Sequence, residues 1–163
     1  MPVGNVSMHN IAFQKAHRYD AKSHGISLPI ELANGTNRVR FDTKLDTGAE
    51  FCLFKREYGE MLGLAIESGE RRTLSTLTGT LVAYGHEVSL RVLGLDFELV
   101  AYFYESPDFR RSVLGRTGWL PTTRLGIVDY DQMLYLSRYD DSSHFPATEK
   151  ASSTFPAISP NMP

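Results

Sequence analysis

One tripeptide in this sequence combines residue types and a position suited to chemistry: Asp46-Thr47-Gly48, which directly follows Leu45. The preceding run, residues 38–45, is typical of a strand. A carboxylate at the end of a strand is held by a rigid scaffold yet stays accessible, and the glycine permits a tight turn. Such a carboxylate can act as a general base on water. The alternative is an ordinary β-turn, because Asp and Gly are both common turn residues.

Signatures of other catalytic classes are absent. The sequence contains no GxSxG, GxxxxGK[ST], GxGxxG or HExxH motif. Its five histidines are dispersed, and a single cysteine, Cys52, provides neither an intramolecular disulfide nor a Cys-based zinc site. Asp129 and Asp131 are interpreted as solvated turn residues rather than cation ligands. We therefore predict no metal and no cofactor.

Composition and charge narrow the class of protein further. The chain has 163 residues, of which 42% are hydrophobic, and this length fits one domain, or one domain with a tail. The 17 basic residues against 19 acidic ones give a formal charge of −2, which argues against nucleic acid as a partner. No apolar run reaches the ~20 residues of a membrane helix, and no secretory signal begins the chain. The sequence predicts a cytoplasmic protein without a membrane partner.

Three regions are expected along the chain. Residues 1–24 form a polar lead without a clear assignment, and residues 25–139 form the folded domain. Four of the eight prolines follow in residues 140–163, where no hydrophobic period is present, so this region is predicted to be a disordered tail. The alternative is a short arm that docks through Phe145, Phe155 and Ile158.

Strands dominate the predicted domain, because its short apolar or alternating runs are bounded by Gly, Asn, Asp and Pro. Helices are expected only at residues 55–64 and in a turn or two at residues 116–120, ended by Pro121. The implied architecture is a small, mainly antiparallel all-β domain that forms a closed or nearly closed barrel. The four predicted hairpins pair residues 25–32 with 38–45, residues 72–78 with 81–84, residues 87–93 with 97–104, and residues 126–130 with 133–139.

Two motifs resemble those of the retropepsin-like aspartic proteases. Residues 45–54 (LDTGAEFCLF) match the family's apolar-Asp-Thr-Gly-Ala segment, and the helix after it ends in Leu-Gly-Leu, as in bacterial members. Val113-Leu114-Gly115 matches the second hallmark, two apolar residues and a glycine near the end of the domain. Residues 125–136 are similar to the family's closing hairpin. The resemblance covers roughly residues 25–139 and implies a small closed barrel of the acid-protease type.

The resemblance also implies an activity, that of an aspartic endopeptidase. Such an enzyme needs two carboxylates that share a proton, one acting on water and the other on the scissile carbonyl. Because the sequence holds one Asp-Thr-Gly, the second Asp46 would come from a two-fold homodimer acting on a peptide or protein substrate. One alternative is a non-catalytic peptide-binding or dimerisation module on the same fold. A weaker one is a monomeric precursor whose pair forms when a partner binds or a terminal segment is removed.

Roles for the neighbouring residues follow from the same resemblance. Thr47 would bond across the axis, Gly48 would admit the substrate backbone, and Ala49 would keep the wall small. Gly115 would support the catalytic loop from below, and an ion pair between Glu50 and Arg116 would brace it. A flap that covers the peptide is expected in the hairpin with Thr76, Leu77, Thr78, Gly79 and Thr80, for which an ordinary exposed hairpin is the alternative.

Overall fold

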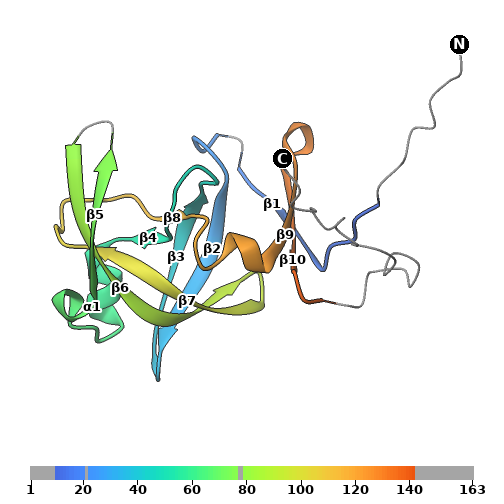
Figure 1. Cartoon of the computed structure of the whole chain (residues 1–163). Coiled ribbons are helices and arrows are strands. Elements are labelled where there is room, and N and C mark those ends of the chain that lie inside the picture. The colour runs from blue at the N-terminus through green and yellow to red at the C-terminus, as the bar shows by residue number, and fades with distance from the viewer. Residues whose placement is uncertain (1–9, 21, 77–78, 142–163) are drawn as a thin grey trace, which may run out of the picture.

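The computed structural model describes residues 10–20, 22–76 and 79–141, and within them the chain is built mainly of strands (Figure 1). Leu77, Thr78 and most of the predicted tail lie outside the described residues. Seven strands form the main sheet, in the order β2-β3-β8-β4-β7-β6-β5. Their bounds are β2 Ser27–Asn34, β3 Asn37–Leu45, β4 Leu53–Phe54, β5 Glu70–Thr76, β6 Gly79–Val92, β7 Leu95–Tyr104 and β8 Val113–Leu114.

The main sheet closes on itself. β2 pairs with β3 on one side and with β6 on the other. Six strands therefore form a hydrogen-bonded ring, in the order β2-β3-β8-β4-β7-β6. β5 lies outside the ring as the second partner of β6. Most pairings are antiparallel, whereas β3–β8 and β4–β7 are parallel. The all-β prediction is confirmed. The ring matters for function because it brings β8, far along the chain, beside the end of β3.

The predicted hairpins are present, with shifts in some turns. Asn34 pairs with Asn37 across Gly35-Thr36, as the Asn-Gly signal indicated. The next turn is formed by Leu93 and Gly94, both at positive φ (50° and 80°), and not by residues 94–96. Such a two-residue turn matches the twist of the flanking strands, so β7 begins earlier than predicted. β6 runs unbroken for 14 residues and serves two hairpins. In the last hairpin the first strand ends at Val128, so Asp129 and Tyr130 belong to the turn and not to the strand.

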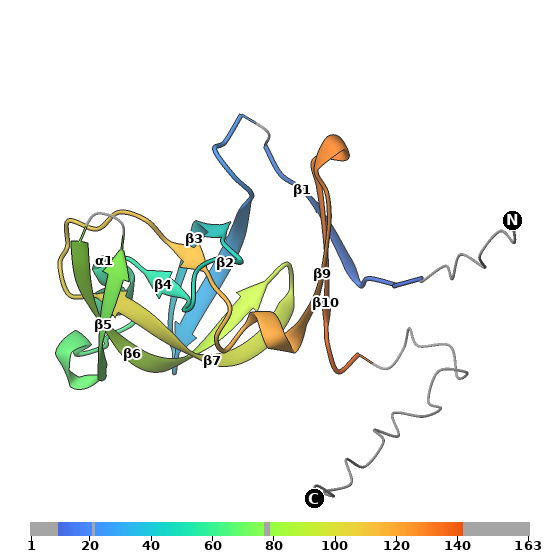
Figure 2. The same cartoon turned by 45° about the horizontal axis from the view of Figure 1, so that its top comes forward.

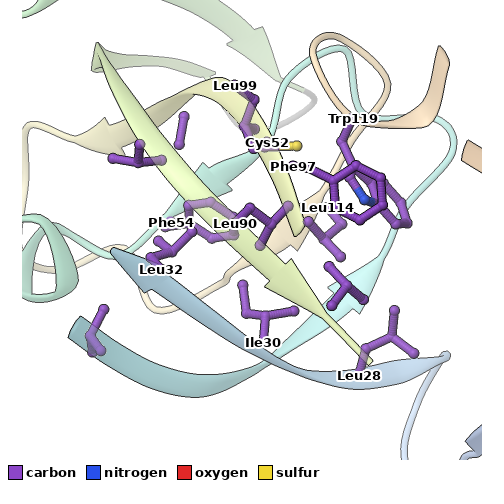
Figure 3. Close-up of a cluster of buried hydrophobic side chains, with 14 of the residues drawn as sticks. Leu28, Ile30, Leu32, Cys52, Phe54, Leu90, Phe97, Leu99, Leu114 and Trp119 are labelled. Carbon is purple, nitrogen blue, oxygen red and sulfur yellow. The ribbon is translucent and has the colours of Figure 1, made fainter. Parts of the chain in front are cut away.

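The core lies inside the ring. Leucine, isoleucine and valine side chains of β2, β3 and β6 meet aromatic and aliphatic side chains of β7 there (Figure 3). Phe54 from β4, Leu114 from β8 and Trp119 beyond β8 are fully buried in the same cluster. The strands β4 and β8 are only two residues long, yet each contributes one of these large buried side chains. Burial therefore fixes both segments that flank the Asp46 loop.

One short α-helix, α1 Arg56–Met61, lies within the predicted helix at residues 55–64. The second prediction, a turn or two at residues 116–120, is right in place but wrong at its end. The N–H of Leu120 donates to the carbonyl of Arg116 at 3.0 Å, and a 3-10 turn then continues over Leu120–Thr122 and contains Pro121 instead of ending before it. Proline is tolerated there, since the first residues of a helix need no backbone donor. Within the part of the chain that the structure describes, no helix has the length and apolarity to cross a membrane.

A second, three-stranded sheet stands beside the ring (Figure 2). It consists of β1 Lys15–Arg18, β10 Met133–Arg138 and β9 Thr123–Val128, in that order. Residues 1–24 are thus not wholly a lead, since β1 lies in this sheet. Buried Tyr19 follows β1, and its hydroxyl donates a hydrogen bond to Asp129 at 2.5 Å, which raises the pKa of Tyr19 to about 12. This bond ties the N-terminal segment to the turn of the β9–β10 hairpin.

Protonation of Glu31 should weaken the ring. Its carboxylate is buried and accepts hydrogen bonds from Arg40 and Arg38, with Arg91 at 3.9 Å, and these guanidinium groups hold its pKa below the usual range. The stabilisation is present above the unfolded-state pKa of glutamate and is lost as the pH falls through the lower folded-state value. Urea unfolding at pH 6 and pH 3 should show a smaller pH-dependent loss for Glu31→Gln than for the wild type. An equal loss in both proteins would contradict this role.

Candidate active site

Asp46 lies just beyond the end of β3, and backbone groups orient its carboxylate. Its Oδ1 accepts hydrogen bonds from the N–H groups of Gly48 (3.0 Å) and Ala49 (3.1 Å). Its own N–H donates to the carbonyl of Leu114 in β8 at 3.0 Å. The side chain is exposed, and within the described residues its Oδ2 has no hydrogen bond. One oxygen is therefore fixed by the loop while the other is left for a ligand or for water.

The segment after β8 lies against the Asp46 loop and is hydrogen-bonded to it. The N–H of Arg116 donates to the carbonyl of Ala49 at 3.0 Å, and the N–H of Thr117 donates to that of Glu50 at 2.7 Å. Gly115 lies at the crossing, where a Cβ atom would be 2.1 Å from the carbonyl oxygen of Phe51. The chain crosses this closely because residue 115 has no side chain. The two motifs seen in the sequence are therefore one structural unit.

The thiol of Cys52 supports this crossing from below and takes no part in chemistry. Its Sγ lies 3.9 Å from the carbonyl oxygen of Gly115, and the side chain is fully buried (Figure 3). Burial raises the pKa of the Cys52 thiol to about 12. The thiol therefore stays protonated and acts as a small apolar side chain.

The other residues expected at this loop differ in their burial and in their contacts. Thr47 and Gly48 are exposed, and Ala49 is partly buried. The expected ion pair between Glu50 and Arg116 is not formed among the described residues; both side chains are exposed, and only backbone groups join the two segments. Backbone hydrogen bonds therefore hold the two segments together, in place of the expected ion pair.

The predicted flap corresponds to the hairpin of β5 and β6. Thr76 pairs with Gly79, and the Thr76 hydroxyl donates to the Gly79 carbonyl at 2.7 Å, while Leu77 and Thr78 fall outside the described residues. Gly79 and Thr80 are exposed at the start of β6. In Figure 1 this hairpin points to the same side as the end of β3, where the Asp46 loop lies.

A small aromatic cluster joins the flap hairpin to the Asp46 loop, and the sequence analysis missed it. Phe51 follows the loop and packs on Tyr102 of β7, with ring centroids 4.7 Å apart. Leu81 and Ala83 of β6 and Tyr104 of β7 complete the buried set. The unbroken apolar run at residues 99–104 was the available signal, because a strand buried on both faces loses its alternation. We call these five residues the sub-flap cluster.

No group of three or more metal-ligating side chains comes together in the described residues. The Oδ1 atom of Asp129 accepts the hydrogen bond from Tyr19. The donor set around Asp46 consists of backbone amides and one carboxylate. This arrangement can bind a polar group or orient a water molecule, and it suits acid–base chemistry.

Comparisons with known proteins give the fold. No family model and no curated protein sequence matches the chain. Among solved structures, a retropepsin-like aspartic protease from Rickettsia conorii is similar, with a TM-score of 0.55 and 20% identity over 76% of this chain and 97% of that chain. EIAV protease, complexed with the inhibitor HBY-793, is similar with a TM-score of 0.46 and 16% identity over 60% of this chain and 86% of that chain. By the likeness to the Rickettsia protein and by its own closed sheet, this chain has the retropepsin-like fold.

Proposed function

We propose that the protein is an aspartic endopeptidase that acts as a homodimer. The observation that carries this proposal is the exposed Asp46 carboxylate, fixed through Oδ1 by two backbone amides and open at Oδ2. A rigid, accessible carboxylate on a retropepsin-like fold has the form that water activation needs. The fold is shared with the Rickettsia protein, which is described as an aspartic protease.

The reaction needs two carboxylates, and each chain supplies one. In a two-fold dimer the two Asp46 side chains would meet at the axis and hold one water between them. One carboxylate takes a proton from the water as the water oxygen attacks the peptide carbonyl carbon. The second carboxyl group is protonated and donates a hydrogen bond to the carbonyl oxygen. The tetrahedral intermediate then collapses as the carboxyl that took the proton from water passes it to the leaving nitrogen, which regenerates that carboxylate. Thr47, exposed beside Asp46, would bond to its mate across the axis.

The β5–β6 hairpin would serve as the flap. Its described strands carry Leu81, which belongs to the sub-flap cluster, and Leu74, which packs against that cluster. A peptide bound in extended form between this hairpin and Asp46 would be shielded from bulk water, which strengthens the electrostatic interactions of the site.

Exposed apolar side chains indicate where the second copy docks. Of the eight large hydrophobic side chains exposed in the described residues, Ile127, Val128 and Tyr130 lie together at the turn of the β9–β10 hairpin, and Tyr130 is 94% exposed. We call these three the hairpin-tip patch. This turn contacts Tyr19, and the chain from there leads to Ile26, whose carbonyl accepts the N–H of Leu45 beside Asp46. We infer that the second copy covers this patch, because clustered exposed apolar side chains are typical of contact surfaces.

Replacing Tyr130 with Asp should weaken the dimer. A charge placed in a buried apolar contact is costly, so the dissociation constant measured by sedimentation should rise by about tenfold or more. Met61→Asp provides the control, because Met61 is 61% exposed at the end of α1, away from the patch. An unchanged dissociation constant for Tyr130→Asp would show that the second copy docks elsewhere.

The test of the function itself is cleavage of a peptide library by the wild type and by Asp46→Asn, with products read by mass spectrometry. Cleavage that depends on Asp46 supports the proposal. Binding of library peptides without turnover would instead identify a non-catalytic peptide-binding module on the same fold.

A further inference from the structure

The loop at residues 105–112 runs from the base of the flap hairpin to the strand beside Asp46. Its first N–H donates to the carbonyl of Val82 in β6 at 2.9 Å, and its last carbonyl accepts the N–H of Lys44 in β3 at 3.0 Å. Two residues later, Leu114 accepts the N–H of Asp46. The loop therefore borders the space between the flap hairpin and the candidate catalytic carboxylate. We call it the β7–β8 loop.

Ring stacking fastens the middle of this loop to the sub-flap cluster. Phe109 stacks on Tyr104 with ring centroids 5.0 Å apart and an angle of 22° between the planes. Tyr104 is 4% exposed and belongs to the buried set that includes Phe51 and Leu81. Phe109 itself remains 40% exposed. The residues that follow Phe109 are therefore held next to the floor of the proposed peptide cleft.

Those residues are two arginines. Arg110 and Arg111 are exposed, and no hydrogen bond or ion pair to either is formed within the described residues. Burial raises the pKa of Tyr104, and the positive charge of Arg111 acts against this rise. The loop's two carboxylates, Glu105 and Asp108, accept hydrogen bonds from neutral hydroxyl groups and form no ion pair with either arginine. The β8 end of the loop therefore presents two guanidinium groups that have no ion-pair partner among the described residues.

The spacing relates this charge to a bound peptide. Arg111 precedes Leu114 by three residues, so its Cα lies no more than about 10 Å from that of Leu114, at ~3.3 Å per residue. Leu114 in turn accepts the N–H of Asp46. In an extended peptide whose scissile bond lies at Asp46, side chains two to three residues from that bond are at a comparable distance, which the long arginine side chains can span. Two-fold symmetry provides one such arginine pair on each side of the bond.

We propose that Arg110 and Arg111 make the cleft selective for peptides with acidic side chains two to three residues from the scissile bond, on either side of it. This inference rests on the proposed function, because it assigns a preference to the same cleft. A solvent-exposed ion pair corresponds to a gain of about three- to fivefold, and this gain decreases with added salt.

Matched peptides test the proposal. A peptide found to be cleaved in the library is made with Glu or with Gln two and three residues from the cleaved bond, and kcat/KM is compared for the two. The wild type should prefer the Glu peptide by about three- to fivefold per position at low salt. Arg111→Glu and the double variant Arg110→Glu/Arg111→Glu should abolish or invert this ratio. Lys15→Glu is the control: Lys15 is exposed in β1, in the small sheet, and should leave the ratio unchanged.

Binding measured by fluorescence anisotropy on Asp46→Asn separates the two proposals. If the wild type cleaves nothing, the proposed catalytic function fails, and the library peptide that binds most tightly is made in Glu and Gln forms instead. Tighter binding of the Glu form, lost on charge reversal at Arg111, then still supports the inference, and equal binding of the two forms overturns it. Equal treatment of Glu and Gln peptides by the wild type overturns the inference and leaves the function standing. A Glu preference that survives both arginine variants also overturns it.

Discussion

Replacing Asp46 with Asn should reduce kcat/KM for any cleaved peptide by about 10²–10⁴-fold, which is the range for loss of a positioned acid or base. In a homodimer the substitution removes both carboxylates at once, so neither activation of water nor donation to the scissile carbonyl survives. Asparagine keeps the side-chain oxygen that accepts the N–H groups of Gly48 and Ala49. The loop and the fold should therefore be preserved.

Two measurements accompany that comparison. Circular dichroism and sedimentation should give the same fold and the same dimer for Asp46→Asn as for the wild type. Adding an excess of Asp46→Asn chains to a fixed amount of wild-type chains should lower the activity of the wild type, because each mixed dimer holds only one Asp46 carboxylate. Undiminished cleavage by Asp46→Asn would remove Asp46 from the mechanism, and activity unaffected by mixing would argue against a shared site.

Local patterns were sufficient for most of the fold. Asn34-Gly35 predicted the β2–β3 turn, and the alternating runs predicted the remaining hairpins. Both signals are local, because turn type and burial on one face of a strand depend on residues adjacent in the sequence. The ring closure between β2 and β6 joins segments about 60 residues apart, and no local pattern encodes it. β1 was missed as well, since four residues with mainly exposed side chains carry little pattern and depend on pairing with β10.

The candidate site was predictable where residue type alone decides the structure. Asp46 and Gly115 were identified from their motifs, and the structure brings their two segments into one crossing. The Glu50–Arg116 ion pair was expected from the family resemblance, but exposed long side chains gain little from pairing, and backbone bonds already hold the segments. Phe51 was quoted within the first motif, yet its partners come from β6 and β7, which only the folded sheet brings together.

Gly115→Ala should have the largest effect on stability of any conservative change near the site. A Cβ atom there would lie 2.1 Å from the carbonyl oxygen of Phe51 and 2.9 Å from that of Ala49, and both contacts are with backbone. Backbone cannot rotate away as a side chain can, so the Asp46 loop must separate from the β8 segment. We expect a loss of about 3 kcal/mol in the free energy of unfolding, a fall in Tm of about 10 °C, and no cleavage even where the protein remains folded.

Gly35→Ala separates this steric effect from the conformational preference of glycine. Gly35 has a φ of +57° with nothing within 4 Å of an added Cβ atom, whereas the φ of Gly115 is outside the left-handed region. The Gly35 variant should therefore lose only about 1 kcal/mol and keep its activity, because its cost comes from backbone preference alone. Equal losses in the two variants would mean that the crossing at Gly115 relaxes easily. The close approach of the two chain segments would then not be what holds the Asp46 carboxylate in place.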